Sequence, residues 1–182
     1  MRLFIAIDLP IFIKSKLEDI INKLKKTNID AKWVESKNIH ITLKFLGETP
    51  QEKVEKIKKI IENVSNNYKV LELNLKNFGF FPNETNPKVF FISTDKEDKL
   101  RDIAKRLENS LENLGYPKEE RFSPHITLAR LKSKKNIDTL KKELKNIKVE
   151  EKFYIEEIAL FKSTLTPLGP IYEKIFKITL KT

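Results

Sequence analysis

The chain contains no cysteine, only one methionine and one tryptophan, and four glycines among its 182 residues. The lack of cysteine excludes disulfide bonds, thiolate catalysis and thiolate-ligated metal sites. No apolar run approaches the roughly 20 residues of a membrane-spanning helix, and the apolar start at 3–9 is too short for a signal-peptide core. We therefore expect a cytoplasmic protein of one domain, since roughly 100–200 residues make one domain.

Basic residues outnumber acidic ones, with 36 Lys and Arg against 26 Asp and Glu and a net charge of +10. Five of these cations are arginines and the others are lysines. A net positive charge attracts polyanions and accelerates their encounter with the protein. An AT-rich genome or a hot working environment also produces lysine-rich chains, so the charge favours a nucleic-acid partner without establishing one.

The spacing of apolar residues predicts short strands that alternate with amphipathic helices. Thr49 is the expected N-cap of the second helix, with Pro50 at its first helical position. In the first half, the pattern predicts strands at 3–8, 39–46 and 68–75 and helices at 11–26 and 51–66. In the second half, it predicts strands at 89–93, 125–131, 153–161 and 172–180, helices at 96–114 and 137–147, and irregular segments at 77–87, 115–124 and 163–170.

Adding 85 to each residue number of the first half superimposes its elements on those of the second. Such internal repetition indicates a duplicated β-α-β-α-β unit. We predict an α+β fold in which residues 1–182 form a single bilobal domain. The repeats cover approximately 1–77 and 87–162, and the strand at 172–180 is extra. Two such units are expected to pack as lobes with antiparallel sheets around a pseudo-two-fold axis, with a central cleft between them.

The only histidines, His40 and His125, are separated by this same offset, and each opens the sequence His-Ile-Thr-Leu. Alternate residues of a strand share a face. In the first copy, His40, Thr42 and Lys44 are therefore expected on one face, and Phe45 is expected in the core with the isoleucines. Thr127 accompanies His125 in the second copy, so two His-Thr pairs are predicted to face each other across the cleft.

This arrangement suits the opening of a cyclic phosphodiester. One histidine can deprotonate water and the other can protonate the leaving oxygen, because an imidazole pKa of about 6.5 makes both forms accessible near neutrality. The threonine hydroxyls can bind the non-bridging oxygens without a metal. A lone His-x-Thr on a strand is usually a solvated surface pair. Two copies in register that contain every histidine of the chain favour a catalytic site instead.

Other motifs are weaker. Neither tetrapeptide has a carboxylate on its strand face, which disfavours zinc, and no phosphate-binding glycine loop or Gly-x-Ser-x-Gly elbow occurs. The basic run 132–135 is interpreted as a solvated loop, with RNA steering as the alternative. The aromatic residues could pack in the core or stack on bases, and core packing is the default interpretation for Trp33, Phe45, Phe78, Phe80 and Phe81.

Several blocks of the chain resemble the 2H phosphoesterase superfamily, specifically the bacterial and archaeal RNA 2′,3′-cyclic phosphodiesterases also called 2′-5′ RNA ligases. The resemblance runs nearly from end to end. The similar blocks are the opening 2–10, Trp33-Val34, the first motif block 40–48, the segments 79–82 and 87–89, the second motif block 122–130, and the terminal segments 160–163 and 169–173. In one departure, Glu120-Arg121-Phe122 stands where the family usually has Arg-Pro-Phe.

The resemblance implies a bilobal, LigT-like fold and hydrolysis of RNA 2′,3′-cyclic phosphates to 2′-phosphates, with reversible ligation of tRNA halves as a weaker activity. It implies that His40 donates a proton to the leaving 3′ oxygen, that His125 activates water, and that Thr42 and Thr127 bind the phosphate. Arg130 follows the second motif as in the family, but its strand parity is opposite to that of His125, so it needs a bulge to reach the cleft.

RNA with 2′,3′-cyclic phosphate ends is the expected partner, and we expect no cofactor, no membrane and no obligate protein partner. Two alternatives stay open. The chain can be a nucleotide- or RNA-binding module with little turnover, or a phosphodiesterase that acts on small cyclic nucleotides.

Overall fold

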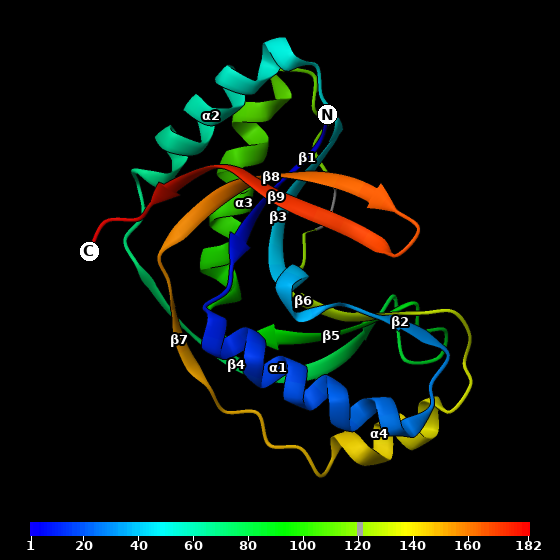
Figure 1. Cartoon of the computed structure of the whole chain (residues 1–182). Helices are drawn as coiled ribbons and strands as arrows, with labels where there is room; N and C mark the ends of the chain where they lie inside the picture. The colour runs from blue at the N-terminus through cyan, green and yellow to red at the C-terminus, as the bar shows by residue number, and fades with distance from the viewer. Residues whose placement is uncertain (120–121) are drawn as a thin grey trace.

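The structure, a computed structural model, describes residues 1–119 and 122–182. The chain forms two lobes, and one continuous sheet, in the order β7-β4-β5-β6-β3-β1-β8-β9 with β2 beside β6, runs through both (Figure 1). The strands are β1 (Arg2–Asp8), β2 (Ala31–Trp33), β3 (His40–Glu48), β4 (Leu71–Phe81), β5 (Val89–Thr94), β6 (Ile126–Leu131), β7 (Lys152–Ile155), β8 (Glu157–Thr166) and β9 (Gly169–Thr179). The helices are α1 (Ile11–Leu24), α2 (Gln51–Ser65), α3 (Glu97–Glu112) and α4 (Ile137–Leu144), with 3-10 turns η1 (Lys25–Thr27) and η2 (Ser36–Asn38).

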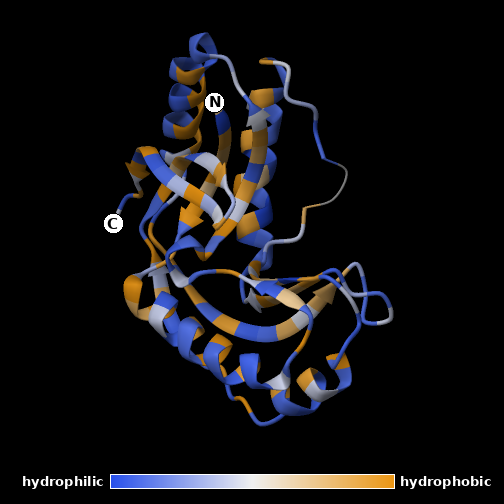
Figure 2. Ribbon diagram, turned by 45° about the vertical axis from the view of Figure 1, so that its right-hand side comes forward, coloured by the Kyte–Doolittle hydropathy of each residue, from blue (hydrophilic) through white to orange (hydrophobic). Residues whose placement is uncertain are grey.

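The upper lobe of Figure 1 contains β3, β1, β8 and β9, which α2 and α3 cover, and the lower lobe contains β4, β5, β6 and β2 with α1 and α4. Hydrophobic and hydrophilic residues alternate along each helix, so one face of each helix is apolar (Figure 2). On α3, Leu100, Ile103, Leu107 and Leu111 recur every three or four residues and are fully or almost fully buried. The apolar period therefore dictates which face of each helix packs on the sheet. None of the described helices is long and apolar enough to cross a membrane.

The offset of 85 recurs in the strand register. Four β1–β3 pairs become four β5–β6 pairs when 85 is added to both members: Phe4↔Phe45, Ile5↔Lys44, Ala6↔Thr42 and Ile7↔Ile41 correspond to Val89↔Arg130, Phe90↔Ala129, Phe91↔Thr127 and Ile92↔Ile126. The pair that joins β3 to β6, Ile41↔Ile126, is its own image under the same offset. The pseudo-two-fold axis therefore passes through this pair, as the predicted α+β fold requires.

Each lobe combines elements of both repeats, which differs from the expected packing of one unit in each lobe. Helix α3 of the second repeat packs with α2 and β3 of the first. Strand β4 of the first repeat crosses to the lower lobe because it continues into an antiparallel hairpin with β5. The repeat limits 1–77 and 87–162 stay a prediction.

A β-bulge follows the histidine in each copy. The register shifts between Ile5 and Ala6 on β1 and between Phe90 and Phe91 on β5, so Leu43 and Leu128 are each the extra residue of the opposite strand. A bulge reverses the alternation of side chains beyond it. Lys44 is consequently 4% exposed, and Phe45 is 59% exposed. The predictions that Lys44 shares the histidine face and that Phe45 lies in the core are therefore wrong.

Several predicted boundaries also change. Strand β4 runs to Phe81, because the aromatic residues predicted as loop pair with β5. The predicted strand 153–161 is divided at Glu156, because β7 pairs with β4 whereas β8 pairs with β1 and β9. Segment 163–170 belongs mostly to the β8–β9 hairpin rather than to a loop.

Thr49 is not the N-cap of α2, because Pro50 occupies that position and the Thr49 hydroxyl donates to the carbonyl of Gly47. The apolar pattern also does not predict the short strand β2, which the structure places beside β6.

The bulge in β3 generates a buried ion pair. Lys44 Nζ lies 3.1 Å from Glu108 Oε1 and donates to the carbonyl of Pro117 at 2.7 Å. Removing one partner of a buried pair leaves the other charge uncompensated, which typically costs about 3–5 kcal/mol. We expect Lys44→Ala to lower the free energy of unfolding, measured in urea, by about this amount. The matched control is Lys58→Ala, since Lys58 pairs with the exposed Glu55. That variant should cost less than about 1 kcal/mol, and equal losses in the two variants would contradict the interpretation.

Candidate active site

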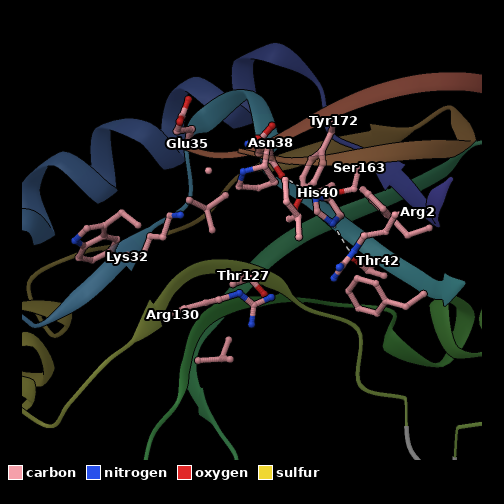
Figure 3. Close-up of a pocket in the computed structure, with 18 of the residues that line it drawn as sticks. Arg2, Lys32, Glu35, Asn38, His40, Thr42, Thr127, Arg130, Ser163 and Tyr172 are labelled. Atoms are coloured by element: carbon pink, nitrogen blue, oxygen red, sulfur yellow. Dashed lines mark hydrogen bonds between the residues drawn. The ribbon is translucent and has the colours of Figure 1, made fainter. Parts of the chain in front are cut away.

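A cleft of about 700 Å³ lies where β3 meets β6. All five residues that the sequence singled out, His40, Thr42, His125, Thr127 and Arg130, line it. Figure 3 shows His40 and Thr42 on one side and Thr127 and Arg130 on the other. The structure therefore brings both copies of the His-x-Thr motif into one cavity.

The pairing of Ile41 with Ile126 explains this convergence. Both isoleucines are fully buried on one face of the sheet. Their neighbours along each strand point to the other face, which is the floor of the cleft. In an antiparallel pair, the residue before the paired position in one strand lies opposite the residue after it in the other, which places His40 beside Thr127 and His125 beside Thr42.

Backbone carbonyls orient both imidazoles. His40 Nδ1 lies 2.6 Å from the carbonyl oxygen of Asn38, and His125 Nδ1 lies 2.7 Å from that of Ser123. A carbonyl only accepts, so Nδ1 carries the proton in each ring, and Nε2 is left to exchange protons. Because the offset of 85 also relates Asn38 to Ser123, the two histidines are held by the same contact.

The surroundings of the two histidines differ. The His40 ring lies 5.0 Å from the ring of Phe4 and 5.5 Å from that of Tyr172, and its Nε2 lies 2.7 Å from the Thr42 hydroxyl (Figure 3). His125 packs edge-on against Phe81 at 4.8 Å, and its side chain is less deeply buried than that of His40. His40 is thus the enclosed member of the pair.

Both histidines favour the neutral form. Burial lowers the pKa of His40 below its usual value, although the Asn38 carbonyl acts in the opposite direction. Burial also lowers the pKa of His125, and the Arg130 guanidinium adds to this effect. A lowered imidazole pKa makes Nε2 an available proton acceptor near neutrality.

Arg130 reaches the cleft because the bulge at Leu128 reverses the strand parity. Leu128 and Ala129 are both buried, and Arg130 is exposed. Arg130 was expected to need a bulge in its strand to reach the cleft, and β6 contains that bulge. The equivalent residue of the first repeat is Phe45, so the two sides of the cleft carry a cation and an aromatic ring at matching positions.

The lining also contains residues that the sequence motifs did not predict as site residues, although some of them belong to the similar blocks. The lining includes Arg2, Lys32, Asn38, Ser163 and Tyr172. Tyr172 and Ser163 face each other across the β8–β9 pair. The similar terminal segments 160–163 and 169–173 indicated that these residues matter. The sequence could not place them in the cleft, because that depends on the long-range pairing of β8 with β1. Glu120-Arg121 of the departing motif lies outside the described residues.

Asn38 links His40 to the β8–β9 hairpin. Its main-chain oxygen accepts a hydrogen bond from Nδ1–H of His40, and its side-chain amide donates to the carbonyl of Pro170 at 3.1 Å. Lys14 Nζ donates to the neighbouring Lys37 carbonyl at 3.2 Å, and Asn38 is 6% exposed. The turn that orients His40 is therefore fastened from two sides.

Among the described residues, no three or more His, Asp or Glu side chains are grouped to hold a metal ion.

Comparison with known proteins adds family information. The model of the 2′-5′ RNA ligase superfamily matches residues 13–166. A protein of Methanocaldococcus jannaschii named RNA 2′,3′-cyclic phosphodiesterase is 40% identical over 177 residues, which cover 96% of this chain and 98% of that protein. One of the same name from Thermotoga maritima is 34% identical over 178 residues, with coverage of 97% and 94%.

Solved structures agree on the fold. The crystal structure of TT0787 of Thermus thermophilus superimposes with a TM-score of 0.83 at 29% identity, covering 100% of this chain and 98% of that one. E. coli LigT complexed with 3′-AMP superimposes with a TM-score of 0.75 at 24% identity, again covering 100% and 98%. The arrangement of two lobes around a cleft is thus shared with these proteins.

The lowered pKa values generate a titration prediction. We expect both histidines to titrate below pH 6.5 in a ¹H–¹⁵N NMR experiment on the imidazole rings, with the neutral rings protonated at Nδ1. In the unfolded chain, the pKa of each histidine is about 6.5. The free energy of unfolding should therefore be highest above pH 6.5 and decrease as the pH falls through the lower native values. A midpoint above 6.5 for either ring would contradict the assignment of burial as the dominant effect.

Proposed function

The chain belongs to the 2′-5′ RNA ligase superfamily and hydrolyses RNA 2′,3′-cyclic phosphodiesters, and we propose that His40 and His125 are its acid–base pair. The observation that carries this proposal is the symmetric convergence of the two His-x-Thr motifs in one cleft. Each imidazole is held at Nδ1 by an equivalent carbonyl. Nε2 of each ring is therefore the atom that takes part in proton transfer.

His125 is assigned as the general base. It is the less enclosed histidine, and the described residues provide no hydrogen-bond partner for its Nε2, which leaves that atom for a water molecule. Its lowered pKa keeps it neutral at pH 7, as a base requires. The base accepts a proton from water while the water oxygen attacks phosphorus.

His40 is assigned as the general acid. As the bond from phosphorus to the 3′ oxygen breaks, Nε2–H donates its proton to that oxygen, which leaves a 3′-hydroxyl and a 2′-phosphate. In the free protein, Nε2 of His40 is hydrogen-bonded to the Thr42 hydroxyl. The leaving oxygen takes the place of this hydroxyl when substrate binds. A bound phosphodiester anion favours the protonated imidazole and so supplies the acid form.

The phosphate is assigned to Thr42, Thr127 and Arg130. All three line the cleft beside the histidines. Hydroxyl and guanidinium donors stabilise the charge that gathers on the non-bridging oxygens in the transition state. Phe45 lines the same cleft with an exposed ring 6.1 Å from that of Phe4. An exposed aromatic ring is a stacking platform for a base, so the terminal base is assigned to Phe45.

We also propose a class of physiological RNA for this reaction. Halves of cleaved tRNA, one of which ends in a 2′,3′-cyclic phosphate, are the proposed substrates. When the 5′-hydroxyl of the other half attacks phosphorus in place of water, the 3′ oxygen leaves and a 2′-5′ bond joins the halves. The cytoplasm is the corresponding compartment. Support comes from the family match and the net charge of +10.

An RNA oligomer with a 2′,3′-cyclic end, incubated with the protein in excess EDTA, tests the reaction. We expect a 2′-phosphate product from the wild type. His40→Ala and His125→Ala should each lower the rate by about 10²–10⁴-fold, because each removes one positioned proton transfer.

The matched control is Ser123→Ala. Ser123 holds His125 through its backbone carbonyl, so this variant should retain nearly full activity. Near wild-type turnover in either histidine variant would overturn the mechanism. Binding without product would indicate a binding module, and turnover of cyclic mononucleotides alone would indicate a small-molecule phosphodiesterase.

The pH profile supplies a separate test. The competent free enzyme needs one protonated and one neutral histidine, and burial lowers the pKa of both. The bell-shaped profile of kcat/KM, which reports the free enzyme, should therefore have its maximum below pH 6.5. A maximum above pH 7 would show that another group controls the reaction.

A further inference from the structure

Seven exposed lysines gather at the end of the lower lobe that carries β2. We call them the lysine cluster: Lys25, Lys26, Lys32, Lys88, Lys132, Lys134 and Lys135. They come from η1, β2, the residue before β5 and the β6–α4 connection. In Figure 1 this region is the right-hand end of the lower lobe, and the β8–β9 hairpin points toward the same side.

Backbone and side-chain hydrogen bonds hold these segments together. The backbone amide of Lys132 donates to the carbonyl of Asp30 at 2.8 Å, and that of Leu131 donates to the carbonyl of Lys88 at 2.8 Å. The side chain of Asn136 donates to the carbonyl of Asn28 at 2.9 Å. The cluster is therefore one surface although its residues are far apart in sequence.

The cluster is continuous with the catalytic cleft. Lys32 is the antiparallel partner of Arg130, and both side chains line the cleft. A side chain added at Gly169 of the hairpin would lie 3.6 Å from Lys32 Nζ. Lys32 thus stands between the two walls at the point where the cleft meets the cluster.

The charge of the cluster is largely unbalanced. Among the residues that the structure describes, the ion pairs are formed by other lysines, including Lys14, Lys58 and Lys141, and by none of these seven. Nearby acids include the half-buried Asp30 and the exposed Asp138. Glu84 lies beside Lys141, and Glu35, which lines the cleft with Lys32, pairs with Lys37 at 3.5 Å.

The helices of the other lobe contrast with this. On α3, acidic and basic residues are interspersed. Arg101 pairs with Glu97, and Arg106 pairs with Asp102. A group of seven lysines that form no ion pair with the described residues therefore lies at one end of the cleft.

We propose that the lysine cluster binds the phosphate backbone of the RNA on the 5′ side of the cyclic terminus. This inference rests on the proposed function, because the strand behind a cyclic 3′ terminus leaves the cleft along one of its walls. The wall with Lys32 and Arg130 carries the cations that a phosphate backbone needs and leads to the cluster. Lysines act as point charges for phosphates and release counterions when they bind. The substrate is then a polymer that contacts the protein well beyond its terminal nucleotide.

The test compares the triple variant Lys132→Ala/Lys134→Ala/Lys135→Ala with Lys56→Ala/Lys59→Ala/Lys105→Ala. The second set removes the same charge from exposed positions on α2 and α3. Activity is measured on a 2′,3′-cyclic mononucleotide and on a cyclic-ended RNA oligomer of roughly 12 nucleotides, a length within single-strand site sizes. Fluorescence anisotropy of the labelled 2′-phosphate oligomer measures binding at several salt concentrations.

We expect the cluster variant to raise KM and Kd for the oligomer by about tenfold and to reduce the salt slope of log Kd by about 2, since each lost phosphate contact removes about 0.7 from a single-strand slope. Turnover of the mononucleotide should be unchanged, and the control variant should resemble the wild type. Equal effects of the two variants, or an equal loss on the mononucleotide, would overturn the proposal. If the wild type opens neither substrate but shows cluster-dependent binding, the proposed reaction fails and the binding surface stands.

Discussion

The fold depends on one antiparallel pair, Ile41 with Ile126, which joins β3 to β6 on the pseudo-two-fold axis. Both side chains are fully buried, and the residues next to them are the histidines and threonines of the cleft. A register slip of one residue in either strand would exchange the two faces and place an imidazole in the core. Burial of two isoleucines therefore specifies the position of the polar site.

The bulges after the histidines turn a symmetric scaffold into an asymmetric site. Both copies bend at the same place, at Leu43 and Leu128. The residues that follow differ, so Phe45 and Arg130 face the cleft from equivalent positions, whereas Lys44 and Ala129 point into the protein. An aromatic ring on one side and a guanidinium on the other suit a ligand with a base at one end and a phosphate at the other. The duplicated backbone positions the acid–base pair. The residues after the bulge differ between the two repeats, and this difference gives the site two unlike sides.

Much of this could be predicted from sequence because repetition and periodicity are local signals. The offset of 85, the two His-x-Thr copies and the apolar faces of the helices are visible without a structure. The bulge was indicated only indirectly, by the wrong parity of Arg130, because strict alternation through Phe45 is an equally good local pattern. The division at Glu156 and the contact of Asn38 with Pro170 depend on partners that are distant along the chain. Such long-range pairings leave no periodic trace in the sequence.

The positions of the cations reconcile two opposing requirements, attraction of RNA and protection of the histidine pKa values. An RNA substrate is attracted by cations, but a cation close to an imidazole lowers the pKa of that imidazole and weakens its hold on a proton. Burial is the main cause of the lowered pKa of His125, and among the charges Arg130 adds to it. For His40, burial again dominates, and Lys14 and His125 are the positive charges that contribute. No member of the lysine cluster is among the causes of either pKa shift. Solvent and salt screen exposed charges beyond about 8 Å, so lysines at the end of the cleft can attract a polyanion without disturbing the acid–base pair. This reasoning explains why the members of the lysine cluster other than Lys32 lie outside the lining of the cleft.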